Sequence, residues 1–275
     1  MIPPSAHPLV SVITIVYNDA PHIAQTIESV LSQTYPHIEY IIIDGGSTDG
    51  TQGIIQSYID TSPPKALHTI TKFISEKDKG IYDAMNKGVA LANGSWCNFM
   101  NSGDRFYSPT SIQEVFAQYP TTPTEISVLY GDTQIVFDTQ HSKILTSQNT
   151  HHKYHHHFTH QSSFIATKLL KTYPYNTAFK IAGDTDFFTK IYHLGYRFQK
   201  VNAIICTFDL NGVSSTLSWQ MFAEDCQIGY QYNKLYPLFL ASKYVFYVIP
   251  RTLLRKLIPA KYKNLARSKW GAKYQ

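Results

Sequence analysis

IIIDGGSTDGT, residues 41–51, is the stretch that decides how this chain folds. The apolar and aromatic run at residues 40–43 suits a strand that is buried on both faces. Glycines 45–46 permit a tight turn, and the polar residues 47–49 can cap a helix that starts near residue 50. Because ligands of open α/β sheets bind outside the carboxyl ends of the strands, Asp44 is placed where a ligand would be recognised. The same stretch also fits an ordinary strand, turn and helix with a solvated aspartate.

Strand and helix patterns alternate over roughly the first half of the chain. Apolar and β-branched runs predict strands, and apolar residues that recur every three or four positions predict helices. This alternation is typical of a parallel sheet with helices on both faces. The expected strands are 9–17, 39–43, 67–74, 96–100 and 128–137, and the expected helices contain residues 23–31, 54–59, 81–91 and 112–119.

Beyond Thr139 the pattern is weaker. Residues 163–165 predict a strand and residues 184–194 a helix, and two further strands are expected at 197–201 and 204–208. The best candidate for a domain boundary lies near Ser214 to Ser218.

The net charge of +5 conceals an asymmetry along the chain. The last acidic residue is Asp225, and ten basic residues follow it. Since the chain has 24 basic and 19 acidic residues, the part up to Asp225 has 14 basic residues and carries about −5, while the remainder carries +10. The two parts are therefore expected to have different partners.

Cysteine usage and the N-terminus favour a cytoplasmic location. Cys97, Cys206 and Cys226 lack the close spacing of a metal knuckle or a disulfide framework, which favours a reducing compartment. The N-terminus has no signal-peptide pattern, and the apolar segment 9–17 is too short to span a bilayer. We expect the protein to stay on the cytoplasmic side.

Three acidic residues, Asp44, Asp104 and Asp184, follow strands or open helices. Asp104 ends the sequence Asn101-Ser102-Gly103-Asp104, which comes directly after the strand expected at 96–100. Two acids at strand ends of one sheet suggest a ligand site. Mg²⁺ or Mn²⁺ is typically held by one or two carboxylates plus substrate phosphates, and Asp104 fits that role. The alternative is that these four residues form only a polar turn.

Five motifs follow one another along the chain: VSVITIVYN (10–18), IDGGSTDGT (43–51), SEKDKGIYDAMNKG (75–88), FMNSGD (99–104) and AGDTDFF (182–188). In this order they resemble family 2 glycosyltransferases of the GT-A fold, and most closely the bacterial branch that builds polysaccharide and lipid-linked repeat units. The resemblance covers about residues 8–215. It implies an α/β, Rossmann-like, mostly parallel central sheet flanked by helices.

The resemblance also implies a domain organisation. Residues 1–215 would form the catalytic domain, with a nucleotide-sugar half at about 8–138 and an acceptor half at about 139–215. Residues 216–275 would form a helical, basic C-terminal extension.

The resemblance implies a role for five residues. Asp44 matches the strand-end aspartate that hydrogen-bonds the nucleobase, Tyr17 matches the tyrosine near it, and Asp78 matches a position beside the nucleotide. Asp104 matches the last acid of the D-x-D motif, which binds the Mg²⁺ or Mn²⁺ that bridges the diphosphate. Asp184 matches the general base of inverting members, and its place at the start of a helix is also typical of an N-cap.

Three further residues, Asn101, His160 and Gln161, bear on the nucleotide and the diphosphate. Asn101 stands in the nucleotide-binding segment where the family usually carries the first acid of D-x-D, so a carboxylate that commonly touches ribose or metal is missing. Metal binding is then weaker, or a neighbouring group substitutes. The identity of the nucleobase also stays open, although Asp44 is compatible with the ring N–H of uracil. His160 and Gln161 match a His-Gln pair near the diphosphate or the acceptor.

A histidine-rich run at residues 151–160 invites a metal interpretation, because imidazole suits zinc and several transition metals. The run has no defined ligand spacing, and such composition is more typical of a solvated loop.

The segment Tyr244 to Ile258 resembles an amphipathic interfacial helix interrupted at Pro250. Its basic residues would favour an anionic membrane surface, which would place the protein on the inner face of the cell membrane. The alternative is a docked helix pair with a solvated basic face. No recognised nucleic-acid-binding module surrounds the charge, which argues against nucleic acid as a partner.

Together these features predict an inverting, metal-dependent glycosyltransferase with a nucleotide-sugar donor, UDP-sugar favoured, and a polysaccharide or lipid-linked acceptor. A sugar-nucleotide nucleotidyltransferase would share the sheet, but it should show a glycine-rich triphosphate loop with Lys or Arg, and residues 17–21 have none. A catalytically silent nucleotide- or sugar-binding protein of the same fold is the other alternative.

Overall fold

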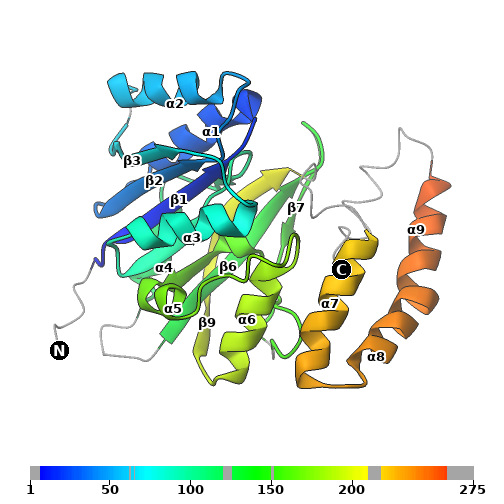
Figure 1. The fold of residues 1–275 in the computed structure, drawn as a ribbon. Coiled ribbons are helices and arrows are strands. Elements are labelled where there is room, and N and C mark those ends of the chain that lie inside the picture. The colour runs from blue at the N-terminus through cyan, green and yellow to red at the C-terminus, as the bar shows by residue number, and fades with distance from the viewer. Residues whose placement is uncertain are drawn as a thin grey trace. The chain divides into compact units, whose positions relative to one another are not determined.

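The computed structural model describes residues 7–61, 63–64, 66–119, 126–149, 152–209 and 218–258 (Figure 1). The backbone divides into two units. Unit 1 comprises Met1–Gln134 and Ile144–Phe208, and unit 2 comprises Ile135–Lys143 and Asp209–Gln275. The boundary predicted near residues 214–218 lies outside the described residues except for Ser218.

Strands and helices alternate through the first part of unit 1, as the sequence predicts. In chain order the elements up to α4 are β1 (Val10–Val16), α1 (Ala20–Leu31), β2 (Ile38–Asp44), α2 (Thr51–Asp60), β3 (Ile70–Ser75), α3 (Ile81–Leu91), β4 (Trp96–Phe99), β5 (Arg105–Phe106) and α4 (Ser111–Ala117). The elements that follow are β6 (Ile126–Val136), β7 (Ser142–Leu145), the 3₁₀ turn η1 (His160–Ser162), β8 (Ser163–Ala166), α5 (Thr167–Thr172), α6 (Gly183–His193) and β9 (Arg197–Asp209).

Within the described residues, nine strands form one sheet in the order β3-β2-β1-β4-β8-β6-β9-β5, with β7 paired to β6. Strands β3, β2, β1 and β4 run parallel, whereas β8 is antiparallel to both β4 and β6. Because parallel strands end at the same edge, the segments after β1, β2, β3 and β4 gather at one edge, which we call the carboxyl edge.

The side chains of β1 alternate between two buried faces. Val10 and Val12 belong to a core cluster that also contains Ile27 of α1 and Ile112 of α4. Ile13, on the opposite face, is fully buried as well, and α3 packs on β1 and β2. Burial on both faces explains the near-continuous apolar runs of these strands.

One sequence-based expectation about strands was wrong. The two strands predicted at 197–201 and 204–208 are a single strand, β9, in which Val201, Ala203 and Ile205 are buried in alternation. The strand continues through Asn202. Its side chain is exposed on the outer face, and its N–H donates to Gln118 Oε1 at 2.9 Å. A polar residue on the outer face was mistaken for a turn.

Unit 2 contains the helices that follow residue 217. They are α7 (Trp219–Tyr232), α8 (Tyr236–Lys243), the π-helical segment η3 (Tyr244–Val248) and α9 (Ile249–Lys256). The rings of Phe222 in α7 and Tyr244 lie 4.8 Å apart, and Ile228 and Leu240 are buried. The predicted helical C-terminal extension is therefore confirmed. Among the helices that the structure describes, none is both long enough and apolar enough to cross a membrane.

Candidate functional site

Two loops at the carboxyl edge are joined by hydrogen bonds. The N–H of Asn18, after β1, donates to Ser47 Oγ at 2.7 Å, and the N–H of Thr48 donates to Asn18 Oδ1 at 2.8 Å. The N–H of Ala20 donates to Asp49 Oδ2 at 3.0 Å. Asn18 adopts a φ of +48°, which asparagine tolerates better than most residues. The side chains of Ser47 and Asp49, together with the N–H of Thr48, thus fix the β1–α1 loop against the β2–α2 loop.

Asp44 lies inside its own turn. Its side chain has 0% exposure. Its Oδ2 accepts hydrogen bonds from the N–H of Gly46 at 3.1 Å, the N–H of Ser47 at 2.9 Å and Ser75 Oγ at 2.6 Å, and its Oδ1 accepts from Ser47 Oγ. Oδ1 accepts one of these hydrogen bonds and Oδ2 three, so the nucleobase contact expected for Asp44 stays a prediction that requires the residues covering the carboxylate to move.

The surface above this turn belongs to Tyr17 and Asp78. A Cβ added to Gly45 would lie 2.6 Å from Asp78 Oδ2 and 3.3 Å from Tyr17 Cδ2. Only glycine therefore fits at position 45 while Asp78 stays in place. Tyr17 is 65% exposed, and Asp78 Oδ1 accepts a hydrogen bond from the N–H of Gly80 at 2.8 Å. The structure thus brings both residues together where the resemblance predicts a nucleotide.

The turn after β4 is held by α1. The N–H of Asp104 donates to the carbonyl of Asn101 at 3.0 Å, and Gly103 adopts a φ of +90°, which an L side chain rarely takes. Thr26 of α1 accepts the N–H of Gly103 at 3.1 Å and donates to the carbonyl of Asp104 at 2.7 Å. Ser102 Oγ donates to Asp19 Oδ2 at 2.6 Å. The predicted polar turn exists, and it fixes Asp104 at the carboxyl edge.

Oxygen atoms at this turn suit a hard cation. Asp104 Oδ2 accepts a hydrogen bond from Gln161 Nε2 at 2.9 Å. Asn101 Oδ1 is a buried oxygen that has no hydrogen-bond partner among the described residues. Such an atom costs free energy unless a ligand or ion satisfies it. No group of three or more His, Cys, Asp or Glu side chains within the described ranges could hold a metal by itself.

His160 and Gln161 connect the two parts of the site. Gln161 contacts Asp104, while His160 is 7% exposed and its Nε2 lies 2.8 Å from the hydroxyl of Tyr175. The His160 ring packs 5.0 Å from the ring of Phe99 at the end of β4. Burial lowers the pKa of His160, although the charge of Asp184 acts in the opposite direction. His160 is therefore neutral near pH 7.

Asp184 is the second residue of α6, and Ala182 is the N-cap, so the N-cap role predicted as an alternative for Asp184 is wrong. Asp184 Oδ1 accepts hydrogen bonds from the N–H of Thr185 at 2.9 Å and from the hydroxyl of Tyr82 at 3.2 Å. Tyr82 is buried in α3, and burial together with the charge of Asp184 raises its pKa far above the ordinary value. The hydroxyl therefore stays protonated, and it shares its proton between the carbonyl of Ile181, at 2.7 Å, and the Asp184 carboxylate. The Asp184 side chain retains 22% exposure.

The histidine-rich run is neither a metal cluster within the described residues nor a fully solvated loop. His152, His156 and His160 are buried, whereas His155 and His157 are exposed. The buried rings pack among aromatic side chains from several elements, namely Tyr130, Phe158, Phe188, Tyr192 and Phe198. The solvated-loop interpretation was wrong because these three histidines belong to a core that the local composition does not reveal.

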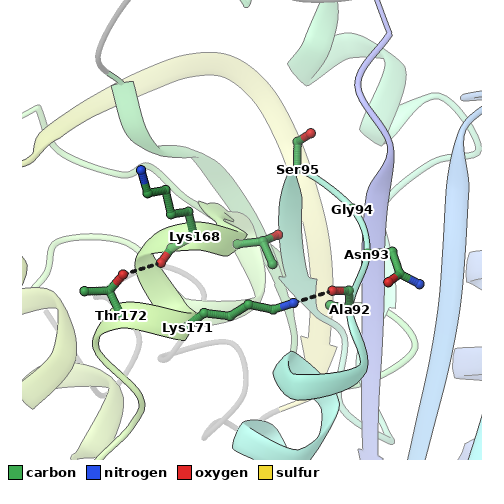
Figure 2. Close-up of a pocket in the computed structure, with 8 residues that line it drawn as sticks. Ala92, Asn93, Gly94, Ser95, Lys168, Lys171 and Thr172 are labelled. Atoms are coloured by element: carbon green, nitrogen blue, oxygen red, sulfur yellow. Dashed lines mark hydrogen bonds between the residues drawn. The ribbon is translucent and has the colours of Figure 1, made fainter. Parts of the chain in front are cut away.

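A pocket of about 640 Å³ lies at the other edge of the sheet (Figure 2). It is lined by Ala92–Ser95, which precede β4, and by Thr167, Lys168, Lys171 and Thr172 of α5. Lys171 Nζ is hydrogen-bonded to the carbonyl of Ala92 at 2.8 Å. None of the predicted site residues is in this lining. The pocket is therefore separate from the carboxyl edge, where the predicted donor and acceptor residues lie.

The family was identified by comparison with known proteins. The protein-family model for glycosyl transferase family 2 matches residues 11–185, a range that includes every candidate site residue. The chain belongs to glycosyl transferase family 2. A similar relative is an uncharacterized glycosyltransferase of Mycobacterium tuberculosis, which is 35% identical over 214 residues that cover 76% of this chain and 78% of the relative. The protein is therefore a transferase enzyme, as its sequence predicted.

Solved glycosyltransferase structures share the fold of this family 2 enzyme. S. aureus TarS 1–349 in complex with UDP-GlcNAc matches with a TM-score of 0.62 and 17% identity, over 93% of this chain and 77% of that one. Mannosyltransferase PcManGT from Pyrobaculum calidifontis in complex with GDP-Man and Mn²⁺ matches with a TM-score of 0.60 and 18% identity, over 97% and 82%. The predicted GT-A fold is confirmed.

Several residues of this glycosyltransferase site were missed in the sequence. Tyr82 and Asn86 lie within the SEKDKGIYDAMNKG motif, and Asn86 hydrogen-bonds both the carbonyl and the N–H of Tyr175. They were assigned only to a helix, although polar residues on an otherwise buried helix face are a signal for such contacts. Tyr175 lies in a weakly patterned segment that gives no local signal, and His156 belongs to the histidine-rich run, whose composition does not show which ring lies beside Asp184.

Proposed function

We propose that this glycosyltransferase moves a sugar from a nucleoside diphosphate donor, UDP-sugar favoured, to a hydroxyl of a polysaccharide or lipid-linked acceptor, with inversion. The observation that supports this best is the chain of contacts from Asp104 through Gln161 and His160 to Tyr175 and Tyr82, which ends at Asp184. It joins a carboxylate suited to the donor diphosphate with a carboxylate suited to the acceptor.

In this proposal Asp78 and Tyr17, rather than Asp44, contact the nucleobase. Asp78 Oδ2 lies over Gly45, where no side chain intervenes. A carboxylate accepts the ring N–H of uracil, and Tyr17 offers an exposed ring for stacking. Asp44 acts indirectly, because its hydrogen bonds hold the turn on which the base would rest.

Mg²⁺ or Mn²⁺ fits the turn after β4. Asp104 and the unpaired Asn101 Oδ1 would hold the ion, with the donor phosphates as further oxygen ligands. When bound, such a cation neutralises charge that develops on the leaving diphosphate. The amide at position 101 gives one formal charge fewer than the family's usual acid, so we expect binding of the free metal to be weak.

Asp184 is the proposed general base. Its carboxylate is partly exposed and accepts a hydrogen bond from Tyr82 on Oδ1, which leaves it open to an acceptor hydroxyl. Taking the acceptor proton as the oxygen attacks the anomeric carbon accounts for a single displacement without an enzymic nucleophile. Such a displacement inverts the anomeric configuration.

A donor screen with the purified full-length enzyme tests the proposal. We expect UDP and a UDP-sugar to bind in the presence of Mn²⁺ and to bind at least tenfold more weakly after chelation. UDP is expected to bind more tightly than CDP, because cytosine lacks the ring N–H that Asp78 would accept. Isothermal titration with UDP, CDP, GDP and UTP gives the affinities. Absence of binding by every diphosphate with Mg²⁺ or Mn²⁺ would refute the proposal.

An Asp78→Ala variant sharpens the same screen. Loss of a hydrogen bond to a charged group costs about 1.5–3 kcal/mol, or roughly 10- to 150-fold in UDP affinity. The preference for UDP over CDP should disappear with it. Asp60 is an acid at the exposed end of α2, and Asp60→Ala is the matched control. It should bind UDP and CDP with the affinities of the wild type. An equal loss of UDP and CDP affinity in Asp78→Ala would show that this carboxylate does not recognise the base.

The surface of unit 2 suits an anionic membrane, where a lipid-linked acceptor would be found. Its exposed apolar side chains are large, and Trp219 and Phe246 are each 81% exposed. The segment after Asp225 has no acidic residue and ten basic ones. The exposed apolar residues of unit 2 in the described ranges include Leu235, Leu238, Phe239, Val245, Tyr247, Ile249, Leu253, Leu254 and Leu257. Exposed apolar and basic side chains on short helices are typical of interfacial segments. With three free cysteines, we place the enzyme at the cytoplasmic face.

Liposome flotation tests membrane binding. The wild type should float with phosphatidylcholine vesicles that contain an anionic phospholipid, and less so with neutral vesicles or in 1 M salt. Phe246→Glu combined with Leu254→Glu should lower the bound fraction tenfold or more, since each apolar side chain contributes about 1.5–3 kcal/mol when buried. These residues are exposed, so the fold should be retained.

The matched control carries the same charges on unit 1. Leu67 and Leu194 are 62% and 53% exposed, and Leu67→Glu with Leu194→Glu should float like the wild type. Equal flotation of all three proteins would remove the membrane from the proposal and leave the donor chemistry unaffected.

A further inference from the structure

The buried histidine His156 lies beside the proposed general base and has no part in the function proposed above. Its Nε2 is 3.7 Å from Asp184 Oδ2, and its side chain is 7% exposed. The ring packs against Phe158 and Phe188, with centroid separations of 5.0 and 4.9 Å. A polar ring in such surroundings needs a partner to offset its desolvation.

The two ring nitrogens of His156 differ in their surroundings. Nδ1 is buried and has no hydrogen-bond partner in the part of the chain that the structure describes. A proton on Nδ1 would leave a buried N–H unpaired and would turn the lone pair of Nε2 toward the carboxylate of Asp184. A proton on Nε2 instead directs a donor at that carboxylate and leaves only an acceptor unpaired, which costs less. The Nε2–H tautomer is therefore favoured.

His156 is neutral near pH 7. Burial lowers its pKa well below the ordinary value, and the neighbouring histidines lower it further. The titratable groups around the pair are Asp184 on α6, Tyr82 on α3, Tyr175 before α6, His155, whose ring stacks on His156 at 5.0 Å, and His152, His157 and His160. Asp184 is the carboxylate in this set, and its Oδ2 is the acceptor that lies nearest the Nε2–H donor.

We propose that His156 is a positioning residue for Asp184, with its Nε2–H held on Oδ2 while the Tyr82 hydroxyl is held on Oδ1. Together the two donors fix the orientation of the carboxylate toward the acceptor. The separation of 3.7 Å exceeds a hydrogen bond, and it shortens when the site fills, as catalytic contacts commonly do. This inference rests on the proposed role of Asp184 as general base.

Hydrolysis of UDP-GlcNAc, in which water replaces the acceptor, gives the first test, with GDP-Man as a second probe. His156→Phe should lower kcat about 10- to 100-fold and change the donor KM less than twofold. Because the carboxylate loses a donor that it holds when the site is filled, the acid limb of the kcat profile, which reports the enzyme–substrate complex, should move up by about one pH unit. His156→Gln keeps an N–H donor and should restore the limb to within a few tenths of a unit.

His152→Phe is the matched control, because His152 is also buried in this aromatic core, where its ring packs against Phe158 and Phe198. The His152→Phe variant should change the thermal stability as His156→Phe does, and it should leave the acid limb of the pH–rate profile where it is in the wild type. An unshifted limb in folded His156→Phe, or the same shift in His152→Phe, overturns the positioning role.

A second measurement does not depend on turnover. In protein labelled with ¹⁵N-histidine, the His156 imidazole should appear as the neutral Nε2–H tautomer at pH 7, and Asp184→Asn should shift its resonances. A neutral Nδ1–H tautomer or a charged imidazolium overturns the inference. Failure of the proposed function would instead appear as absent diphosphate binding in the donor screen, so the two failures are distinguishable.

Discussion

Asp184→Asn is expected to lower the rate of glycosyl transfer by roughly 10² to 10⁴ while UDP still binds with unchanged affinity. Asparagine keeps the shape of the side chain, and its carbonyl oxygen can accept the hydrogen bonds that Thr185 and Tyr82 donate to Oδ1. It cannot take a proton from the acceptor hydroxyl. Radiolabelled donor transfer under saturating acceptor, together with isothermal titration of UDP, separates the chemical step from binding.

The control for this variant is Asp186→Asn. Asp186 lies in the same first helical turn of α6, so it experiences the same helix dipole, and its replacement removes the same charge. Transfer by Asp186→Asn should remain within a few fold of the wild type. Unchanged transfer by Asp184→Asn would contradict the general-base role. Loss of UDP binding in this variant would show that Asp184 belongs to the donor site instead.

The second large effect is expected at Asp104. Asp104→Asn should abolish most of the Mn²⁺-dependent gain in UDP affinity and lower transfer by roughly 10² to 10³, because a cation that neutralises a leaving diphosphate contributes several kcal/mol. The hydrogen bond from Gln161 can be kept through the amide oxygen, so the local fold should persist. UDP titrations with and without Mn²⁺, run beside transfer assays, measure both effects.

Asn101→Asp gives the opposite change at the same turn. It replaces the unpaired Oδ1 with a carboxylate and restores the acid that the family usually carries, so Mn²⁺ should bind at least several-fold more tightly. If Asp104→Asn kept its full response to Mn²⁺, or if Asn101→Asp weakened that response, the metal would have to bind elsewhere.

The parallel half of the sheet could be predicted because its signals are local. The apolar run that ends at Asp44 and the polar residues behind it specify β2, the turn and α2 within about twenty residues. The bounds predicted for α3, residues 81–91, match the structure, since Asn93-Gly94 ends the helix. Residues 163–165 are likewise a strand, β8, and residues 184–194 correspond to α6.

The contacts that complete the site could not be predicted, because they join residues far apart in the chain. Tyr82 and Asp184 are separated by 102 positions, and Gln161 and Asp104 by 57. Asp44 shows the converse problem. Its place at a strand end was predicted correctly, yet the sequence does not reveal that the neighbouring N–H groups and Ser75 would hydrogen-bond to its carboxylate and leave it buried.

The hydrogen bonds between the β1–α1 and β2–α2 loops have a consequence for the kinetics of donor capture. Asn18, Ser47 and Asp49 hold both loops in one arrangement before any nucleotide arrives. Binding then costs little ordering entropy on this side of the donor, and association need not wait for these loops to rearrange. Donor residence time would instead be set by the diphosphate end, where the turn after β4 would hold the proposed cation.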